Sequence, residues 1–153
     1  MTKRRSATVH ASCVLVGARA VLIRGPSGSG KSRLALELVQ AAASGNLRFA
    51  RLVADDRVHL AAAGGHLLAR PAEKLAGLIE IRGVGLLRLP YEPRALVGIV
   101  VDLGAENASR LPNPAQRQVA IDGILLPRLA VAAGLAALPG LMALLNSPKE
   151  FWL

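Results

Sequence analysis

Gly25-Pro26-Ser27-Gly28-Ser29-Gly30-Lys31-Ser32 is a complete phosphate-loop pattern, G-x-x-x-x-G-K-[ST]. The apolar run at residues 20–23 precedes it, and the apolar-periodic residues 34–39 follow it. The pattern therefore has the strand–loop–helix context that the motif requires. A Gly- and Ser-rich surface loop that matches by chance is the alternative, and the two fitting flanks argue against it. These residues predict a strand, a phosphate-binding loop and a helix in that order.

The residue types within 25–32 are those that bind a polyphosphate. Glycines allow backbone N–H groups to point at phosphate oxygens, and the following helix N-terminus adds the positive end of its dipole. Lys31 can reach the β- and γ-phosphates, and the Ser32 hydroxyl can hold Mg²⁺. We therefore expect the chain to bind a nucleoside triphosphate or a related polyphosphate through all eight residues.

Length and composition limit the class of protein. The chain has 153 residues, enough for a single domain, and 52% of them are apolar, which excludes a disordered chain. Aromatic residues make up 3%, so stacking of bases on aromatic side chains is not expected. The net charge is +9, which fits an acidic partner or simply arginines scattered over a solvated surface. The single Cys13 excludes an intrachain disulfide and fits a reducing compartment.

The remaining pattern predicts a mixed order of strands and helices. Strands are expected at 8–16, 19–24, 51–54, 57–62, 66–70, 78–81, 86–89, 97–101 and 119–126. A helix is expected at about 31–43, one helical turn at 72–75, and a polar loop at 107–118. The apolar residues 129–145 predict two short core or interface helices, with a membrane segment as a minor alternative.

Phosphoryl transfer needs metal ligands and a proton acceptor as well as a phosphate loop. Asp55 and Asp56 end an apolar run, so one could act as base while the other binds metal; a turn-forming pair is an equal alternative. Asp102 also ends an apolar run and is a rival metal contact. Glu80 and Arg82 lie on one face of an expected strand, as a site pair or as an exposed charge pair.

The order of His10, residues 25–32, residues 52–56 and residues 78–85 resembles bacterial HPr kinase/phosphorylase, which phosphorylates a serine of the phosphocarrier HPr. Leu78-Ile79-Glu80-Ile81-Arg82-Gly83-Val84-Gly85, after a phosphate loop and an Asp-Asp pair, is the distinctive part. The resemblance extends over about residues 8–129. It is to the short form of the family, which consists of the catalytic domain only.

The resemblance implies a role for each matching residue. Asp56 would be the general base, and His10 would lie beside it. Lys31 would bind phosphate, while Ser32, Glu80 and Asp55 would serve the metal. The further catalytic residues implied are Arg82 and, as a weaker match, Arg110. Asp102 then becomes structural.

The resemblance also implies an α/β fold of the P-loop-containing, phosphoenolpyruvate carboxykinase-like type, with a mixed sheet and flanking helices. ATP and Mg²⁺ would be the cofactors and an HPr-like phosphocarrier the partner. The protein would be a cytoplasmic homo-oligomer, often a hexamer, without nucleic-acid or membrane partners. The family's Pro-Val-Arg-Pro-Gly-Arg-Asn stretch, tied to phosphorolysis, is absent after Leu126-Pro127-Arg128, so kinase activity is better supported than phosphorylase activity.

Two other classes of function stay open from the residues alone. A small-molecule kinase would share the phosphate loop and use Asp102 for metal, so replacing Asp102 rather than Asp56 would abolish its turnover. A nucleotide-binding regulator would bind ATP and form no phosphoserine. A nucleic-acid binder rests on charge alone.

Overall fold

The computed structural model describes residues 7–148, which form eleven strands, two α-helices and one 3₁₀ turn. The strands are β1 Thr8–Val9, β2 Ala11–Val16, β3 Arg19–Arg24, β4 Ala50–Ala54, β5 Val58–Ala63, β6 His66–Pro71, β7 Leu78–Ile81, β8 Gly85–Arg88, β9 Ala95–Leu103, β10 Gln118–Ile121 and β11 Ile124–Val131. The helices are α1 Lys31–Ala43 and α2 Leu138–Leu145, and the 3₁₀ turn is η1 Glu73–Leu75.

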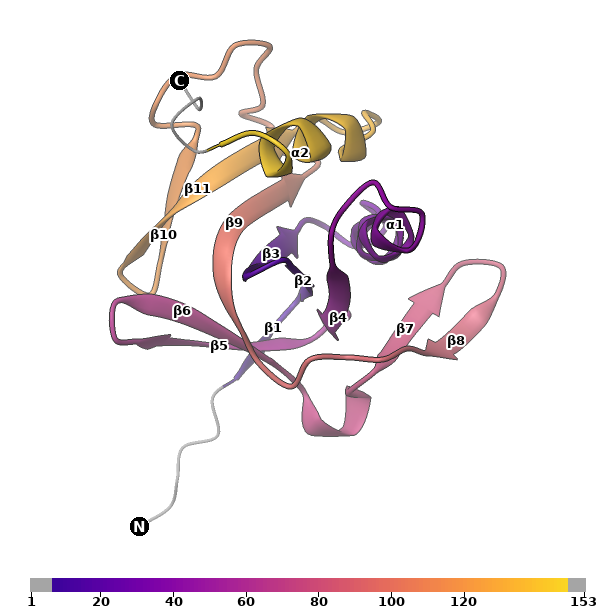
Figure 1. Cartoon of the computed structure of the whole chain (residues 1–153). Coiled ribbons are helices and arrows are strands. Elements are labelled where there is room, and N and C mark those ends of the chain that lie inside the picture. The colour runs from indigo at the N-terminus through magenta and orange to yellow at the C-terminus, as the bar shows by residue number, and fades with distance from the viewer. Residues whose placement is uncertain (1–6, 149–153) are drawn as a thin grey trace.

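Nine of these strands form one curled, mixed sheet with few helices against it (Figure 1). Its order is β1-β5-β6-β9-β3-β2-β4, with β11 and β10 added beside β9. β9 pairs in parallel with β3 and β11, and antiparallel with β6. β6 pairs with the start of β9 and β11 with its end, so both halves of the sheet meet on this long apolar strand. The expected mixed α/β architecture is confirmed.

The core lies on both faces of the central strands. Successive residues of β3 alternate between the two apolar clusters, with Val21 and Ile23 in one and Leu22 in the other. α1 covers the first cluster with Leu34 and Leu38, which lie one turn apart on the same helix face. α1 packs against β2, β3 and β4, and it begins directly after the phosphate loop that leaves the end of β3.

Several expected elements agree with the structure. The helix expected at 31–43 is confirmed, as are the strands expected at 57–62 and 66–70, which pair as the antiparallel hairpin of β5 and β6. The strand expected at 8–16 is interrupted at His10, which separates β1 from β2. Residues 105–117 contain no strand or helix, as the polar, proline-containing sequence predicts.

Two expectations for the C-terminal third are wrong. The single strand expected at 119–126 is a hairpin, because Asp122-Gly123 turns the chain between β10 and β11. The two helices expected within 129–145 are the end of β11 and one helix, α2. The start of this apolar run pairs with β9 as a buried strand, which its composition does not distinguish from a helix. No helix among residues 7–148 is long and apolar enough to cross a membrane.

Candidate active site

The phosphate loop connects β3 to α1. Gly30 precedes the helix with a left-handed φ of 99°, and no side chain caps the helix N-terminus. Gly25 lies against the end of β9, where an added Cβ would come within 2.9 Å of the Leu103 carbonyl oxygen. The glycines thus allow a close approach to β9 and leave the first N–H groups of α1 available to an anion.

The side chains of this loop fit a bound polyphosphate. The Ser29 hydroxyl is buried without a hydrogen-bond partner within the described residues, which leaves a polar group for a ligand to satisfy. Lys31 Nζ donates to the carbonyl oxygens of Gly25 and Pro26, at 2.8 and 3.2 Å, so its ammonium group lies over the loop. A phosphate would bring acceptor oxygens to both groups.

Asp55 is the buried centre of the site. It is 6% exposed, and its Oδ1 accepts hydrogen bonds of 2.7 Å from the hydroxyls of both Ser12 and Ser32. Its Oδ2 accepts a hydrogen bond of 3.1 Å from the backbone N–H of Glu80. One carboxylate therefore joins β2, α1 and β7, and it lies directly beside the hydroxyl that a phosphate loop offers to Mg²⁺.

Asp56 and His10 form an exposed pair next to this centre. His10 Nδ1 lies 3.5 Å from Asp56 Oδ1, and both side chains are 62% exposed. Asp56 has a φ of 66°, a left-handed conformation that Asp tolerates better than most residues. Its backbone N–H donates to Ser12 Oγ at 3.3 Å, so Ser12 ties the turn to Asp55. The turn buries one carboxylate and exposes its neighbour.

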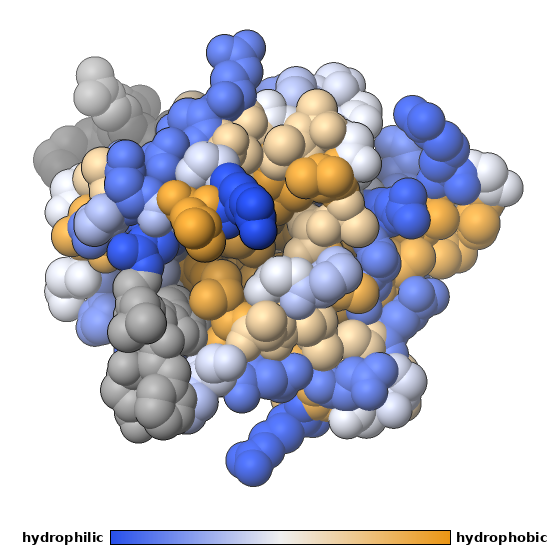
Figure 2. Space-filling view, turned by 90° about the horizontal axis from the view of Figure 1, so that it is seen from above, coloured by the Kyte–Doolittle hydropathy of each residue, from blue (hydrophilic) through white to orange (hydrophobic). Residues whose placement is uncertain are grey.

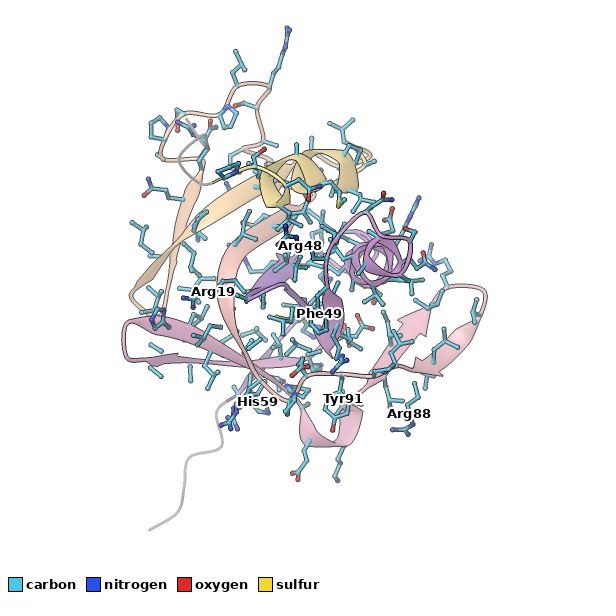
Figure 3. The ribbon with its side chains drawn as sticks, viewed as in Figure 1. Arg19, Arg48, Phe49, His59, Arg88 and Tyr91 are labelled. Atoms are coloured by element: carbon cyan, nitrogen blue, oxygen red, sulfur yellow. The ribbon has the colours of Figure 1, made fainter. Side chains whose placement is uncertain are left out.

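The β7–β8 hairpin brings Glu80 to the site. Gly77, with a φ of 78°, precedes β7 and packs against Tyr91. The backbone N–H of Leu89 donates to the Gly77 carbonyl oxygen at 2.7 Å. Tyr91 forms a parallel bridge with Leu52 of β4, the strand that leads to Asp55. Figure 3 shows Tyr91 on the connection from β8 towards β9. Arg82 lies in the exposed turn beyond Glu80, outside β7, so the expected strand alternation does not extend to it.

Within residues 7–148, no side-chain hydrogen bond or ion pair joins Arg110 to the other candidate residues. Arg110 is exposed in the segment 105–117 and borders a hollow of about 830 Å³, together with β11 and α2. Figure 2 looks onto α2 from above and shows apolar atoms in the middle of this face with hydrophilic atoms around them. Asp102 is held by two arginines, Arg24 and Arg128, and no hydrogen bond or ion pair among the described residues joins it to Ser32.

The donor set at Ser32 consists of hard oxygen atoms. Residues 7–148 contain no group of three or more His, Cys, Asp and Glu side chains placed to hold a metal. Ser32 and Asp55 instead supply one hydroxyl and one carboxylate, with the chain carrying Glu80 bonded to the same carboxylate. Such oxygens suit Mg²⁺, which commonly takes one or two carboxylates and completes its shell with water and phosphate.

Ser12 is the site residue that sequence reasoning missed. It is fully buried in an apolar strand, and its hydroxyl both donates to Asp55 and accepts from Asp56. A polar residue between Ala11 and Cys13, two positions after His10, is the signal that could have found it, since a buried hydroxyl needs a partner.

Comparison with known proteins identifies the family. Residues 2–91 match the model of the HPr Serine kinase C-terminal domain, a range that includes the phosphate loop, both aspartates and Glu80 but ends before Arg110. The chain belongs to this family. An HPr kinase/phosphorylase from Streptococcus salivarius is 40% identical over 129 residues, which are 80% of this chain and 35% of that protein. One from Streptococcus pneumoniae, strain Hungary19A-6, is 35% identical over 136 residues, which are 81% and 41%.

A solved structure supports the fold. The Hpr(Ser) kinase/phosphatase from Coxiella burnetii matches with a TM-score of 0.69 and 24% sequence identity, covering 90% of this chain and 84% of that one. This HPr kinase-family chain thus spans 35% and 41% of the length of the two streptococcal relatives, and it shares its fold with a structure of about its own size.

Proposed function

We propose that the chain is an ATP- and Mg²⁺-dependent protein serine kinase that acts on HPr or an HPr-like phosphocarrier. The observation that carries this proposal is the placement of the Asp55 carboxylate between the phosphate-loop hydroxyl of Ser32 and the turn that exposes Asp56 beside His10. The relatives are named as HPr kinase/phosphorylases, and the family model supports a kinase.

Asp56 is proposed to accept the proton of the acceptor serine. A serine hydroxyl is a weak nucleophile, and a carboxylate within hydrogen-bond reach removes its proton as it attacks the γ-phosphorus. Exposure suits this role, because the acceptor serine belongs to another protein and must approach from solvent. His10, whose Nδ1 lies 3.5 Å from Asp56 Oδ1, is proposed to orient this carboxylate.

Charge neutralisation is assigned to the phosphate loop and its neighbours. Lys31 and the backbone N–H groups of the loop, which only Pro26 lacks, bind the β- and γ-phosphates, and Ser29 gains its missing partner there. Ser32, Asp55 and Glu80 are the residues that would hold Mg²⁺, which would neutralise part of the negative charge on the phosphates. Arg82 and Arg110 are proposed to approach the transferred phosphoryl group from the two exposed segments that carry them.

The finer features follow from the family and stay part of the proposal. Residues 1–153 would form a single catalytic domain of the phosphoenolpyruvate carboxykinase-like type. The protein would act in the cytoplasm as a homo-oligomer, such as the hexamer that the family resemblance implies. Phosphorolysis of phosphoserine is not proposed, because residues 129–134 lack the family's stretch for it.

The decisive experiment is incubation of the full chain with Mg-ATP and HPr-type phosphocarriers, with phosphoserine read by mass spectrometry. Asp56→Asn should abolish the product. Asp122→Asn is a matched control, since Asp122 is also an exposed aspartate with a positive φ, 49°, in the distant β10–β11 turn. Retained ATP binding with no phosphoserine on any phosphocarrier would favour a nucleotide-binding regulator instead.

A further inference from the structure

Asp102 receives guanidinium groups from both neighbouring strands. Its backbone lies opposite Arg24 on β3 and Ala130 on β11. Arg24 donates from Nε to Oδ1 at 2.7 Å and from Nη2 to Oδ2 at 2.9 Å, while Arg128 donates from Nε to Oδ2 at 2.5 Å. The side chains of Asp102 and Arg128 are only 14% and 11% exposed. Both oxygens of this largely buried carboxylate accept hydrogen bonds, and Arg24 donates to each of them. Such a two-bond pairing fixes the relative orientation of the two side chains.

The Arg24 side of this cluster adjoins the phosphate loop. Arg24 is the last residue of β3, immediately before Gly25. The first loop residues rest on the end of β9, since a Cβ on Gly104 would lie 3.4 Å from Pro26 Cγ. The position of Asp102 on β9 and the path of the chain into the phosphate loop are therefore set together.

The Arg128 side holds the segment 107–116. Arg128 Nη2 donates to Asn107 Oδ1 at 3.0 Å, and Nη1 donates to the Gln116 carbonyl oxygen at 3.1 Å. Gln116 Nε2 in turn donates to the Asn107 carbonyl oxygen at 2.8 Å, which fastens the two ends of the segment together. Arg110 lies between these ends, with an exposed side chain.

We propose that Asp102 is a positioning residue, which holds the segment carrying Arg110 in a fixed place relative to the phosphate loop. Arg24 links Asp102 to the strand that leads into the phosphate loop, and Arg128 links Asp102 to the segment 107–116. The proposal rests on the proposed function only in giving Arg110 a part in phosphoryl transfer. It differs from a metal-contact role for Asp102, because both carboxylate oxygens already accept hydrogen bonds from arginines.

The connection is tested first by hydrogen exchange, which does not require catalysis. Asp102→Asn removes the charge, and Arg128→Lys keeps a cation but loses the forked set of donors. Both variants should exchange the amides of 107–116 faster than wild type by about tenfold, while β2 and β3 stay protected. Glu92→Gln is the matched control, because it breaks an ion pair of similar length, Arg51–Glu92 at 2.9 Å, away from this cluster.

Kinetics then tests the link to Arg110. Asp102→Asn and Arg128→Lys should lower kcat for phosphoserine formation by about tenfold or more, with the Kd for ATP and the half-saturating Mg²⁺ concentration unchanged. In an Arg110→Ala background, Asp102→Asn should cause little further loss, because residues that act as a unit are not additive. Glu92→Gln should leave kcat unchanged.

The outcomes separate the two proposals. Unchanged exchange in 107–116 in both variants overturns the positioning role, whatever the kinase assay gives. A raised Mg²⁺ requirement in Asp102→Asn, or an equal loss of kcat with and without Arg110, also overturns it. If wild type forms no phosphoserine, the proposed function fails, and the exchange experiment alone decides whether Asp102 holds the segment. If Asp102→Asn does not fold, Arg128→Lys carries the same test.

Discussion

Ser32 Oγ lies 2.7 Å from Asp55 Oδ1, so the hydroxyl of the phosphate loop and a carboxylate 23 positions later form a direct hydrogen bond. Asp55 Oδ1 also accepts a hydrogen bond from the Ser12 hydroxyl. Because Ser12 also accepts the N–H of Asp56, this chain of bonds fixes the candidate base relative to the candidate metal site. The geometry of the site therefore depends on one buried carboxylate.

Replacing Asp55 should destabilise the fold as well as stop turnover. Asp55→Ala leaves the Ser12 hydroxyl and the Glu80 N–H without their acceptor, and unsatisfied buried groups cost about 1–3 kcal/mol each. We expect the free energy of unfolding, measured in urea, to fall by about 2–3 kcal/mol. Asp56→Ala is the control, because that side chain is exposed. Equal unfolding midpoints for the two variants would contradict this account.

His10 should matter only through Asp56. His10→Ala removes the group 3.5 Å from the Asp56 carboxylate, and we expect kcat to fall by about tenfold while ATP affinity stays unchanged. In an Asp56→Asn background the same change should have no further effect. His66→Ala, at the exposed start of β6, should leave kcat as in wild type. An additive loss in the double variant would show that His10 acts on its own.

The first half of the fold is well predicted because its signals are local. The phosphate loop fixes a strand before it and a helix after it, and Leu34 and Leu38 give that helix its buried face. Residues 129–145 are apolar without a clear period, so nothing local shows that their start pairs with β9. That pairing depends on residues about 28 positions away, Arg128 with Val100, which a local pattern does not contain.

The sequence indicated the residues with recognisable motifs, such as Ser32 and Asp55, but neither their arrangement nor the part played by Ser12. Asp55 and Asp56 were expected at the end of one apolar run, but β4 ends at Ala54 and the following turn orients the two side chains. Ser12 and Arg128 carry no motif, and their importance comes from buried partners far along the chain. Long-range hydrogen bonds of this kind appear only once the sheet is assembled.

Gly77 should be required for the hairpin that carries Glu80. Gly77→Ala would force a Cβ to within 2.9 Å of Tyr91 Cδ1 at a φ of 78°, so we expect a loss of more than about 1 kcal/mol in unfolding free energy. Phosphoserine formation should fall as β7 shifts from Asp55. Gly65→Ala has a nearly equal φ, 79°, and no atom within 4 Å, so it shows the conformational cost alone. Equal losses in the two variants would exclude a role for the Tyr91 contact.

Asp102 should make part of the free energy of unfolding depend on pH. Burial alone raises the pKa of Asp102, but hydrogen bonds and charges from Arg24 and Arg128 outweigh it and hold this pKa below its ordinary value. A depressed pKa in the folded state contributes stability above the unfolded pKa of about 3.9. That contribution is lost as the pH falls through the folded pKa. The difference in unfolding free energy between wild type and Asp102→Asn should thus be largest near neutral pH and shrink below about pH 4. A pH-independent difference would contradict the ion-pair account.

The Ser29 hydroxyl should lower the stability of the nucleotide-free protein and raise its affinity for ATP. Its hydroxyl is buried without a partner in residues 7–148, so Ser29→Ala removes an unsatisfied group and should leave the free protein as stable or more stable, by up to about 1 kcal/mol. ATP would then lose a donor to its phosphates, and affinity should fall by about threefold to tenfold. Thermal unfolding with and without Mg-ATP measures both effects, since the ligand-induced rise in Tm follows affinity. Ser27→Ala removes an exposed hydroxyl of the same loop and keeps the backbone N–H through which residue 27 would bind phosphate, so it should change neither. A lower Tm for nucleotide-free Ser29→Ala would mean that the hydroxyl already has a partner in the free protein.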